Sequence, residues 1–161
     1  MQYKFKKSIT GSQIDQLVKY SQTDPIIIKF TSDPIRFKDK TSATEWLGKK
    51  VSVYTLSDKD GNLIGITWFH KKPLPIRDFT TNLNSNDYPL TFAIRIYGKA
   101  RGKGLSFNFM KQSFDDLNLE TVWIETSFDN IPTIKLAEKF GFKKVSDPDP
   151  RGKIIMTRNQ P

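Results

Sequence analysis

The sequence predicts an α/β domain of the α+β kind, in which helices flank a mixed and mostly antiparallel sheet. Three observations support this prediction. The 161 residues are 37% hydrophobic and 12% aromatic, which suits one substantial core and is too little for two typical domains. Segments of helical periodicity alternate with short apolar runs. Glycine or proline stands where many of these segments end. We therefore expect a single domain over residues 1–161.

The N-terminal segments predict a strand followed by a helix. Residues 2–9 alternate as a strand does, and Ser12 stands three residues before Asp15, a spacing that favours a helix start. Pro25 ends this helix, because the residue before a proline avoids the helical conformation. Residues 26–30 fit either a short strand or a packed loop.

A second helix and a hairpin are expected next. Ser42 and Glu45 repeat the capping spacing before an apolar pair. The apolar runs 51–56 and 63–69 flank a turn that contains glycine, as the strands of a hairpin do. Residues 71–89 carry three prolines and no sustained period, so they predict a long loop.

The C-terminal half repeats a strand and helix pattern. The expected elements are a strand over 90–97, a helix over 105–117, a strand over 121–126, a helix that starts near Asn130, and closing strands over 142–145 and 154–157. Gly141 lies where a helix end needs a left-handed residue.

The most informative segment follows the strand at 90–97. Arg101, Gly102, Lys103 and Gly104 form a basic turn directly before a helical pattern. Free backbone N–H groups and the positive end of a helix converge at such a turn, which suits a phosphate. Its spacing is neither that of the P-loop nor that of the dinucleotide fingerprint GxGxxG. The turn predicts a ligand that carries phosphate.

Composition excludes several other kinds of site. The chain has no cysteine and one histidine, so disulfides, thiolate metal sites and cysteine nucleophiles are excluded, and we expect no metal. A net charge of +9 favours polyanions, phosphorylated cofactors or acidic substrates, although a solvated lysine surface explains it equally well. No apolar run has the length of a signal peptide core or a membrane span. We expect a cytoplasmic protein with no membrane partner.

Two segments resemble motifs of the GCN5-related N-acetyltransferase (GNAT) superfamily. Residues 130–142, NIPTIKLAEKFGF, resemble its N-x-x-A-x-x-L-Y-E-K-x-G-F signature. Residues 101–106 are similar to its acyl-CoA motif, R-x-x-G-x-G/A, with Ser106 as a small substitute at the last position. The resemblance implies a sheet that opens a splayed cofactor cleft between its fourth and fifth strands.

The resemblance also implies that acetyl-CoA, or another acyl-CoA, is the co-substrate. The amides of residues 101–106 would bind the diphosphate, and residues 94–96 would pair with the pantetheine arm as an added strand. The implied cofactor-binding residues are Ile94, Arg95, Ile96, Arg101, Gly102, Lys103, Gly104, Leu105, Ser106 and Asn130. For Asn130, a plain helix cap is an equally good interpretation.

The reaction implied by the resemblance is direct attack of a primary amine on the thioester. Ala137 stands where the superfamily commonly has a tyrosine that protonates the leaving thiolate. Water, Tyr97 or Ser127 are alternative acids, or the thiolate leaves unassisted. Asp87 and His70 are candidate bases, and each also fits a structural role.

Glu125 is a further carboxylate in the strand beyond the expected cleft. Its alternation with Val122 and Ile124 predicts that its side chain points away from the core that they fill.

Three functions are compatible with these features. An N-acetyltransferase accounts for both motifs, whereas Ala137 would suit a catalytically weak or inactive acyl-CoA-binding regulatory module. A nucleic-acid-binding domain accounts only for the charge, and no helix-turn-helix or aromatic RNA-binding strand is visible. The acceptor would be a small-molecule, peptide or RNA-linked amine, and the positive charge favours neutral, acidic or nucleic-acid-linked acceptors. The resemblance allows a homodimer.

Overall fold

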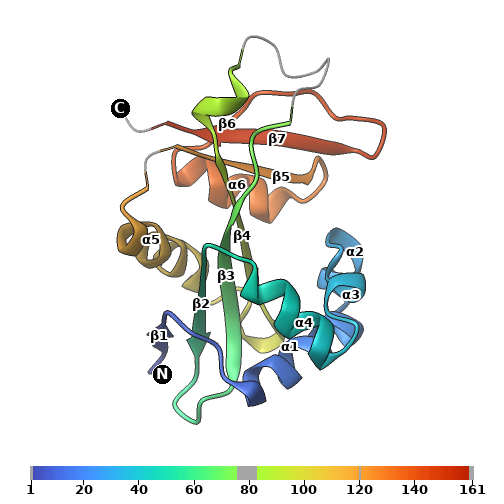
Figure 1. Cartoon of the computed structure of the whole chain (residues 1–161), viewed down its shortest axis with the longest axis vertical. Helices are drawn as coiled ribbons and strands as arrows, with labels where there is room; N and C mark the ends of the chain where they lie inside the picture. Colours follow the sequence, from blue (N-terminus) through green and yellow to red (C-terminus); the bar gives the residue numbers. More distant parts are fainter. Residues whose placement is uncertain (1, 76–82, 120, 160–161) are drawn as a thin grey trace.

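A computed structural model describes residues 2–75, 83–119 and 121–159. Its sheet has the strand order β1-β2-β3-β4-β5-β7-β6 (Figure 1). The strands are β1 (Lys4–Lys6), β2 (Ser52–Ser57), β3 (Leu63–Lys71), β4 (Leu90–Ile96), β5 (Val122–Ser127), β6 (Lys143–Lys144) and β7 (Lys153–Arg158). Neighbouring strands pair antiparallel, except that β4 and β5 run parallel. The predicted mixed, mostly antiparallel sheet is confirmed.

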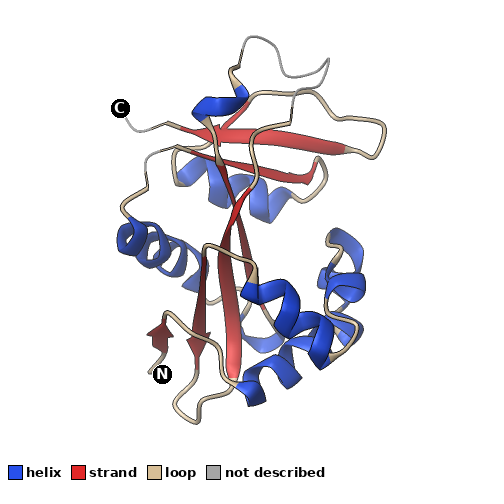
Figure 2. Ribbon diagram, viewed as in Figure 1, coloured by secondary structure: helices blue, strands red, loops and turns tan. Residues whose placement is uncertain are grey.

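Helices cover both faces of the sheet (Figure 2). They are α1 (Gly11–Thr23), α2 (Pro25–Phe30), α3 (Asp33–Arg36), α4 (Lys40–Gly48), α5 (Leu105–Leu117) and α6 (Ile131–Lys139), with 3₁₀ turns at Ser85–Asp87 and Gly98–Ala100. Among the described helices, none has the length and apolar character that a membrane crossing requires.

Two apolar cores lie on opposite faces of the sheet, as the alternation of β3 shows. Ile66 and Trp68 pack with residues of α1, α2 and α4, and we call this side the α1–α4 face. Phe69 packs with Phe109 and Phe114 of α5 on the other side, the α5–α6 face. The helix predicted over residues 105–117 therefore packs its apolar side into this core.

The first helices begin before the predicted caps. The Thr10 hydroxyl accepts a hydrogen bond from the Gln13 amide, and the Gln13 side chain accepts one from the Thr10 amide. This capping box replaces the predicted start at Ser12. Helix α4 is capped by Asp39, whose carboxylate accepts from the Ser42 amide at 2.7 Å. The capping rule was right, but an earlier residue satisfies it in each case.

Residues 26–30 form a helix, so neither interpretation of this segment was correct. Asp24 caps α2 by accepting from the Ile26 amide at 3.0 Å, and proline occupies the first turn. The single-turn helix α3 was not predicted either. Within the expected long loop, β3 extends to Lys71 and a 3₁₀ turn forms, whereas residues 76–82 lie outside the described residues.

Candidate functional site

Strands β4 and β5 join at one register position and then separate. Thr91 lies opposite Trp123 near the start of both strands, and no other pair of described residues joins the two strands. Strand β4 lies in the middle of the sheet, yet Phe92 is its only fully buried residue. Neighbouring β3 is buried along most of its length. We call the open stretch beyond Thr91 and Trp123 the splay, and it is the feature expected of a cofactor cleft.

The open edge of β4 carries backbone groups that can pair with an extended ligand. The Tyr97 amide donates to the Ile64 carbonyl of β3 at 3.0 Å. Because hydrogen-bonded pairs alternate along an antiparallel ladder, the amides and carbonyls of Ile94 and Ile96 turn away from β3 and toward the splay. The Ile94 carbonyl accepts from Arg95 Nη1 at 3.0 Å. This edge therefore has backbone groups free of β3 at Ile94 and Ile96, as pairing with an added strand would require.

The glycine turn presents open backbone at the start of α5. Gly102 and Gly104 have φ values of +75° and +71°, and a Cβ built on either glycine would meet no other heavy atom within 4 Å. Gly104 is the N-cap of this 13-residue helix and supplies no capping side chain, and the first turn has no acidic residue. The amides of Leu105 and Ser106 therefore belong to a positive helix end with open space beside it. Such an end binds anions.

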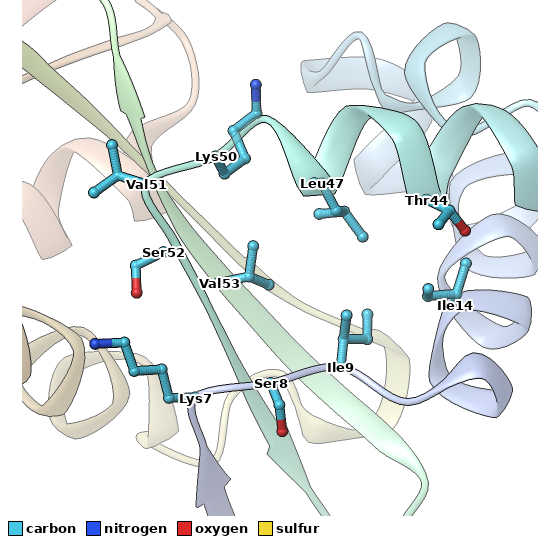
Figure 3. A pocket seen from close by; sticks show the side chains of 11 residues that line it. Lys7, Ser8, Ile9, Ile14, Thr44, Leu47, Lys50, Val51, Ser52 and Val53 are labelled. Atoms are coloured by element: carbon cyan, nitrogen blue, oxygen red, sulfur yellow. The ribbon is translucent and has the colours of Figure 1, made fainter.

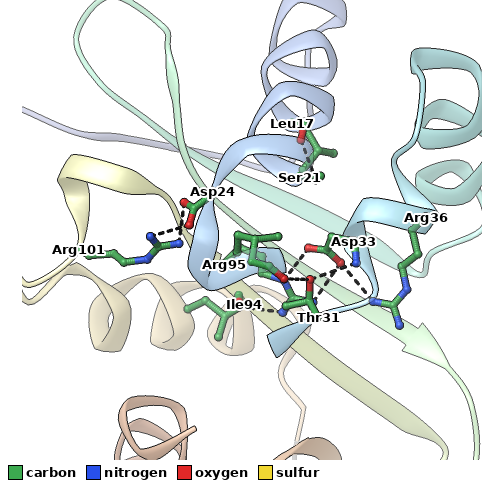
Figure 4. Close-up of polar contacts among 10 residues, drawn as sticks. Leu17, Ser21, Asp24, Thr31, Asp33, Arg36, Ile94, Arg95 and Arg101 are labelled. Atoms are coloured by element: carbon green, nitrogen blue, oxygen red, sulfur yellow. Dashed lines mark hydrogen bonds and ion pairs between the residues drawn. The ribbon is translucent and has the colours of Figure 1, made fainter. Parts of the chain in front are cut away.

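Arg101 forms a bidentate ion pair with Asp24, which precedes α2 in the helix layer (Figure 4). Its Nη1 and Nη2 lie 2.9 Å and 2.8 Å from the two carboxylate oxygens of Asp24, which also accepts from the Gly98 amide. Burial alone would raise the pKa of Asp24, but Arg101 and the amides of Gly98 and Ile26 outweigh it and lower the pKa. The charge of Arg101 is thus balanced within the protein, whereas Lys103 is exposed at the turn.

A second ion pair joins the middle of β4 to α3. Arg95 Nε and Nη2 donate to the fully buried Asp33 of α3 at 2.7 Å and 3.2 Å (Figure 4). Arg36 also reaches the same carboxylate at 3.3 Å. Sequence reasoning missed Asp24 and Asp33, because each stands before or at the start of a short helix and looks like a local chain break.

Asn130 occupies the N-cap position of α6 without capping it through its side chain. Its backbone amide donates to the Ser127 carbonyl at 3.0 Å. The interpretation of the Asn130 side chain as a plain helix cap is therefore wrong. Ser127 Oγ receives a hydrogen bond from Lys153 Nζ at 3.0 Å. Ala137 is 1% exposed within the core of the α5–α6 face.

Two of the catalytic candidates occupy structural settings. Asp87 is exposed in the 3₁₀ turn that precedes β4, and its amide bonds to the Asn84 carbonyl. Tyr97 is 4% exposed on the α1–α4 face and packs on Tyr20 with ring centroids 4.8 Å apart. Burial raises the pKa of Tyr97 well above its ordinary value, and its hydroxyl has no hydrogen-bond partner in the described part of the chain.

The third candidate, His70, lies at the end of β3 beside the closed end of the splay. It faces Thr91 across the ladder, and its Nδ1 is 3.3 Å from Lys50 Nζ. Burial lowers the pKa of His70, and the nearby charges of Lys50, Lys72 and Arg36 lower it further. Both effects favour the neutral imidazole, which is the form that a base requires.

Glu125 lies on β5 within the splay. Val122 and Ile124 fill the core of the α5–α6 face, and Glu125 points to the other side, as alternation predicted. Its side chain is 25% exposed, and Oε2 lies 3.2 Å from Arg151 Nη2. Glu125 is thus a charged group on the α1–α4 face, next to the open edge of the sheet.

An apolar hollow of about 450 Å³ lies elsewhere, between α1, α4 and β2 (Figure 3). Ile9, Ile14, Leu47 and Val53 line it, and Lys7 and Lys50 stand at its sides. No residue of β4, β5 or α5 lines it, and it shares Lys50 with the surroundings of His70. Within the described ranges, no group of three or more His, Cys, Asp or Glu residues could hold a metal ion.

Comparison with known proteins agrees with this geometry. No family model matches the chain, and no curated protein sequence matches it. Among solved structures, the aminoglycoside acetyltransferase AAC(6')-Ib in complex with coenzyme A and kanamycin is 17% identical, with a TM-score of 0.67 over 99% of this chain and 95% of that one. A spermidine N-acetyltransferase SpeG chimera from Vibrio cholerae and hSSAT is 15% identical, with a TM-score of 0.69 over 99% and 96%. The chain has the fold of the GNAT acetyltransferases, as its two motifs predicted.

Proposed function

We propose that this protein is an N-acetyltransferase that transfers the acetyl group of acetyl-CoA to a primary amine. The observation that carries the proposal is the placement of the glycine turn at the open end of the splay. The uncapped start of α5 offers amides to a diphosphate, and the adjoining edge of β4 offers a strand partner to an extended arm. Structures with the same fold, such as AAC(6')-Ib, contain coenzyme A.

Residues of the turn and of β4 would hold the acyl donor. The amides of Leu105 and Ser106 would bind the diphosphate, and the exposed Lys103 would add a positive charge. The edge groups of Ile94 and Ile96 would align the arm along β4. An amide donor near the thioester carbonyl would stabilise the developing oxyanion, an effect of about 2.7–4 kcal/mol in other enzymes.

Glu125 is our candidate for the group that takes the proton from the amine. The side chains of Asp33 and Asp24 are 0% and 7% exposed and pair with Arg95 and Arg101, so neither is accessible to an acceptor. Glu125 is partly exposed within the splay, and the Arg151 contact orients it. Ala137 has no hydroxyl to protonate the thiolate, which leaves Ser127 or water among the acids considered above.

A catalytically weak or inactive acyl-CoA-binding module is the second candidate, and Ala137 is the observation that favours it. Two measurements separate the candidates. Acetyl-CoA at 100 times its Kd should stabilise the protein by about 2.7 kcal/mol in either case. Release of free CoA with a panel of primary amines supports the enzyme. Stabilisation without release across the panel supports the binding module, and absence of stabilisation contradicts both.

A further inference from the structure

Four cationic or titratable side chains meet at the closed end of the splay, and we call them the cation cluster: Arg36, Lys50, His70 and Lys72. They come from α3, the link after α4, the end of β3 and the segment that follows it. Lys50 Nζ lies 3.3 Å from His70 Nδ1 and 3.6 Å from the centroid of the Trp46 ring. The Arg36 guanidinium lies 5.2 Å from the same ring. Two cations thus share one aromatic ring.

Among the described residues, few carboxylates form ion pairs with this cluster. Asp33 is the one described carboxylate that pairs with Arg36, and Arg95 already occupies both of its oxygens. Lys50 and Lys72 form no ion pair with any described residue. Burial, followed by Arg36, Lys49 and Lys72, lowers the pKa of Lys50 to about 8. Repulsion among these charges therefore raises the free energy of the folded protein, and a bound anion would reduce that repulsion.

The cluster lies where an acceptor would approach the acyl group. His70 faces Thr91, and Thr91 pairs with Trp123 at the point where the splay closes. Trp123 Nε1 donates to the Lys72 carbonyl at 2.8 Å, and Lys72 Nζ lies 5.8 Å from the Trp123 ring. An arm that runs from the glycine turn along β4 ends toward this point. The negative charge of Glu125 also acts on Arg36.

We propose that the cation cluster binds a carboxylate or phosphate carried by the acceptor, so that the acceptor is an amine joined to an anionic group. The proposal rests on the proposed N-acetyltransferase function and names the substrate class of that site. Glu125 would face the amine while the cluster holds the anionic end. Carboxylate and phosphate groups both carry negative charge delocalised over two or three oxygens, and both accept hydrogen bonds from guanidinium and ammonium groups.

His70 is the only histidine, so its ring signals in NMR report directly on the cluster. Inorganic phosphate and succinate are titrated separately, which distinguishes the two anion sources. We expect saturable shifts of the His70 signals with at least one of them. Lys50→Gln should weaken that affinity about tenfold, and Lys72→Gln should weaken it as well. The control is Lys59→Gln, in the exposed hairpin turn, which should leave the affinity unchanged.

Absence of saturable binding of both anions would overturn the proposal, as would equal affinities in Lys50→Gln and Lys59→Gln. Acetyl-CoA affinity is measured on the same samples. If acetyl-CoA binds while phosphate and succinate do not, the anion site is wrong and the acetyltransferase function stands. If acetyl-CoA does not bind, the proposed function itself fails. Turnover of glucosamine 6-phosphate should show a KM about tenfold lower than that of glucosamine, and equal KM values contradict the proposal.

Discussion

Both carboxylate oxygens of Asp24 contact the guanidinium of Arg101, at 2.9 Å and 2.8 Å. Asp24 caps α2, and Arg101 begins the glycine turn that leads into α5. The pair therefore connects the helix layer of one sheet face with the start of a helix on the other. This connection fixes the turn on which the proposed diphosphate site depends.

Breaking this pair should destabilise the protein. Asp24→Asn leaves the Arg101 charge without its partner and weakens the acceptor for two backbone amides, so we expect a loss of about 1–3 kcal/mol in the free energy of unfolding. Urea denaturation measures the loss, and a double-mutant cycle with Arg101→Gln isolates the coupling. Because the pKa of Asp24 is lowered in the folded state, this stability is present above pH 4 and disappears as the pH falls toward that lowered value. Additive effects of the two substitutions would contradict the coupling.

Restoring the tyrosine of the superfamily signature should harm this protein. Ala137 is buried in the core of the α5–α6 face, so Ala137→Tyr overpacks that core and should cost about 1–3 kcal/mol. Thermal and urea unfolding measure the cost. Lys135→Tyr, at an exposed position of the same helix, is the control and should change stability little. A stable Ala137→Tyr variant with faster acetyl transfer would show that the core can accommodate the ring.

Glu125→Gln should slow acetyl transfer while acetyl-CoA binding persists. If Glu125 takes the amine proton, kcat should fall by about 100-fold or more. The control is Glu138→Gln, at an exposed position of α6, which should keep the wild-type rate. Unchanged kcat in Glu125→Gln would exclude the role that we assign to this carboxylate.

The lowered pKa of Lys50 predicts a specific dependence of stability on pH. In the folded protein Lys50 loses its proton near pH 8, whereas in the unfolded chain it does so near pH 10.5. Between these values the unfolded state binds more protons, so this group makes the free energy of unfolding rise with pH. Comparing wild type with Lys50→Gln at pH 7.5 and about pH 9.5 by urea denaturation tests this. The wild type should gain stability relative to the variant, and an equal change in both contradicts the shift.

Local sequence patterns accounted for the sheet, the hairpin and the glycine turn, because alternation, turn residues and helix starts depend on neighbours in the chain. The ion pairs of Asp24 and Asp33 were not predictable in this way. Each joins residues more than sixty positions apart, and α3 is a single turn without an apolar period. The cation cluster likewise combines side chains from separate segments.

The conformation of Gly104 links the fold to the proposed ligand. Its φ of +71° is a left-handed value that side chains rarely adopt, and a β-branched residue there would also project into the open space beside the first amides of α5. Gly61, in the hairpin turn, has a comparable φ of +85° and the same open surroundings. Valine at either position should therefore strain the backbone similarly.

The most direct test is the affinity for acetyl-CoA, measured by calorimetry, in Gly104→Val and Gly61→Val. We expect both variants to fold with similar losses of stability, of about 1–2 kcal/mol. Gly104→Val should bind acetyl-CoA at least tenfold more weakly than wild type, whereas Gly61→Val should bind it normally. Wild-type affinity in a folded Gly104→Val protein would contradict the assignment of the glycine turn as the diphosphate site.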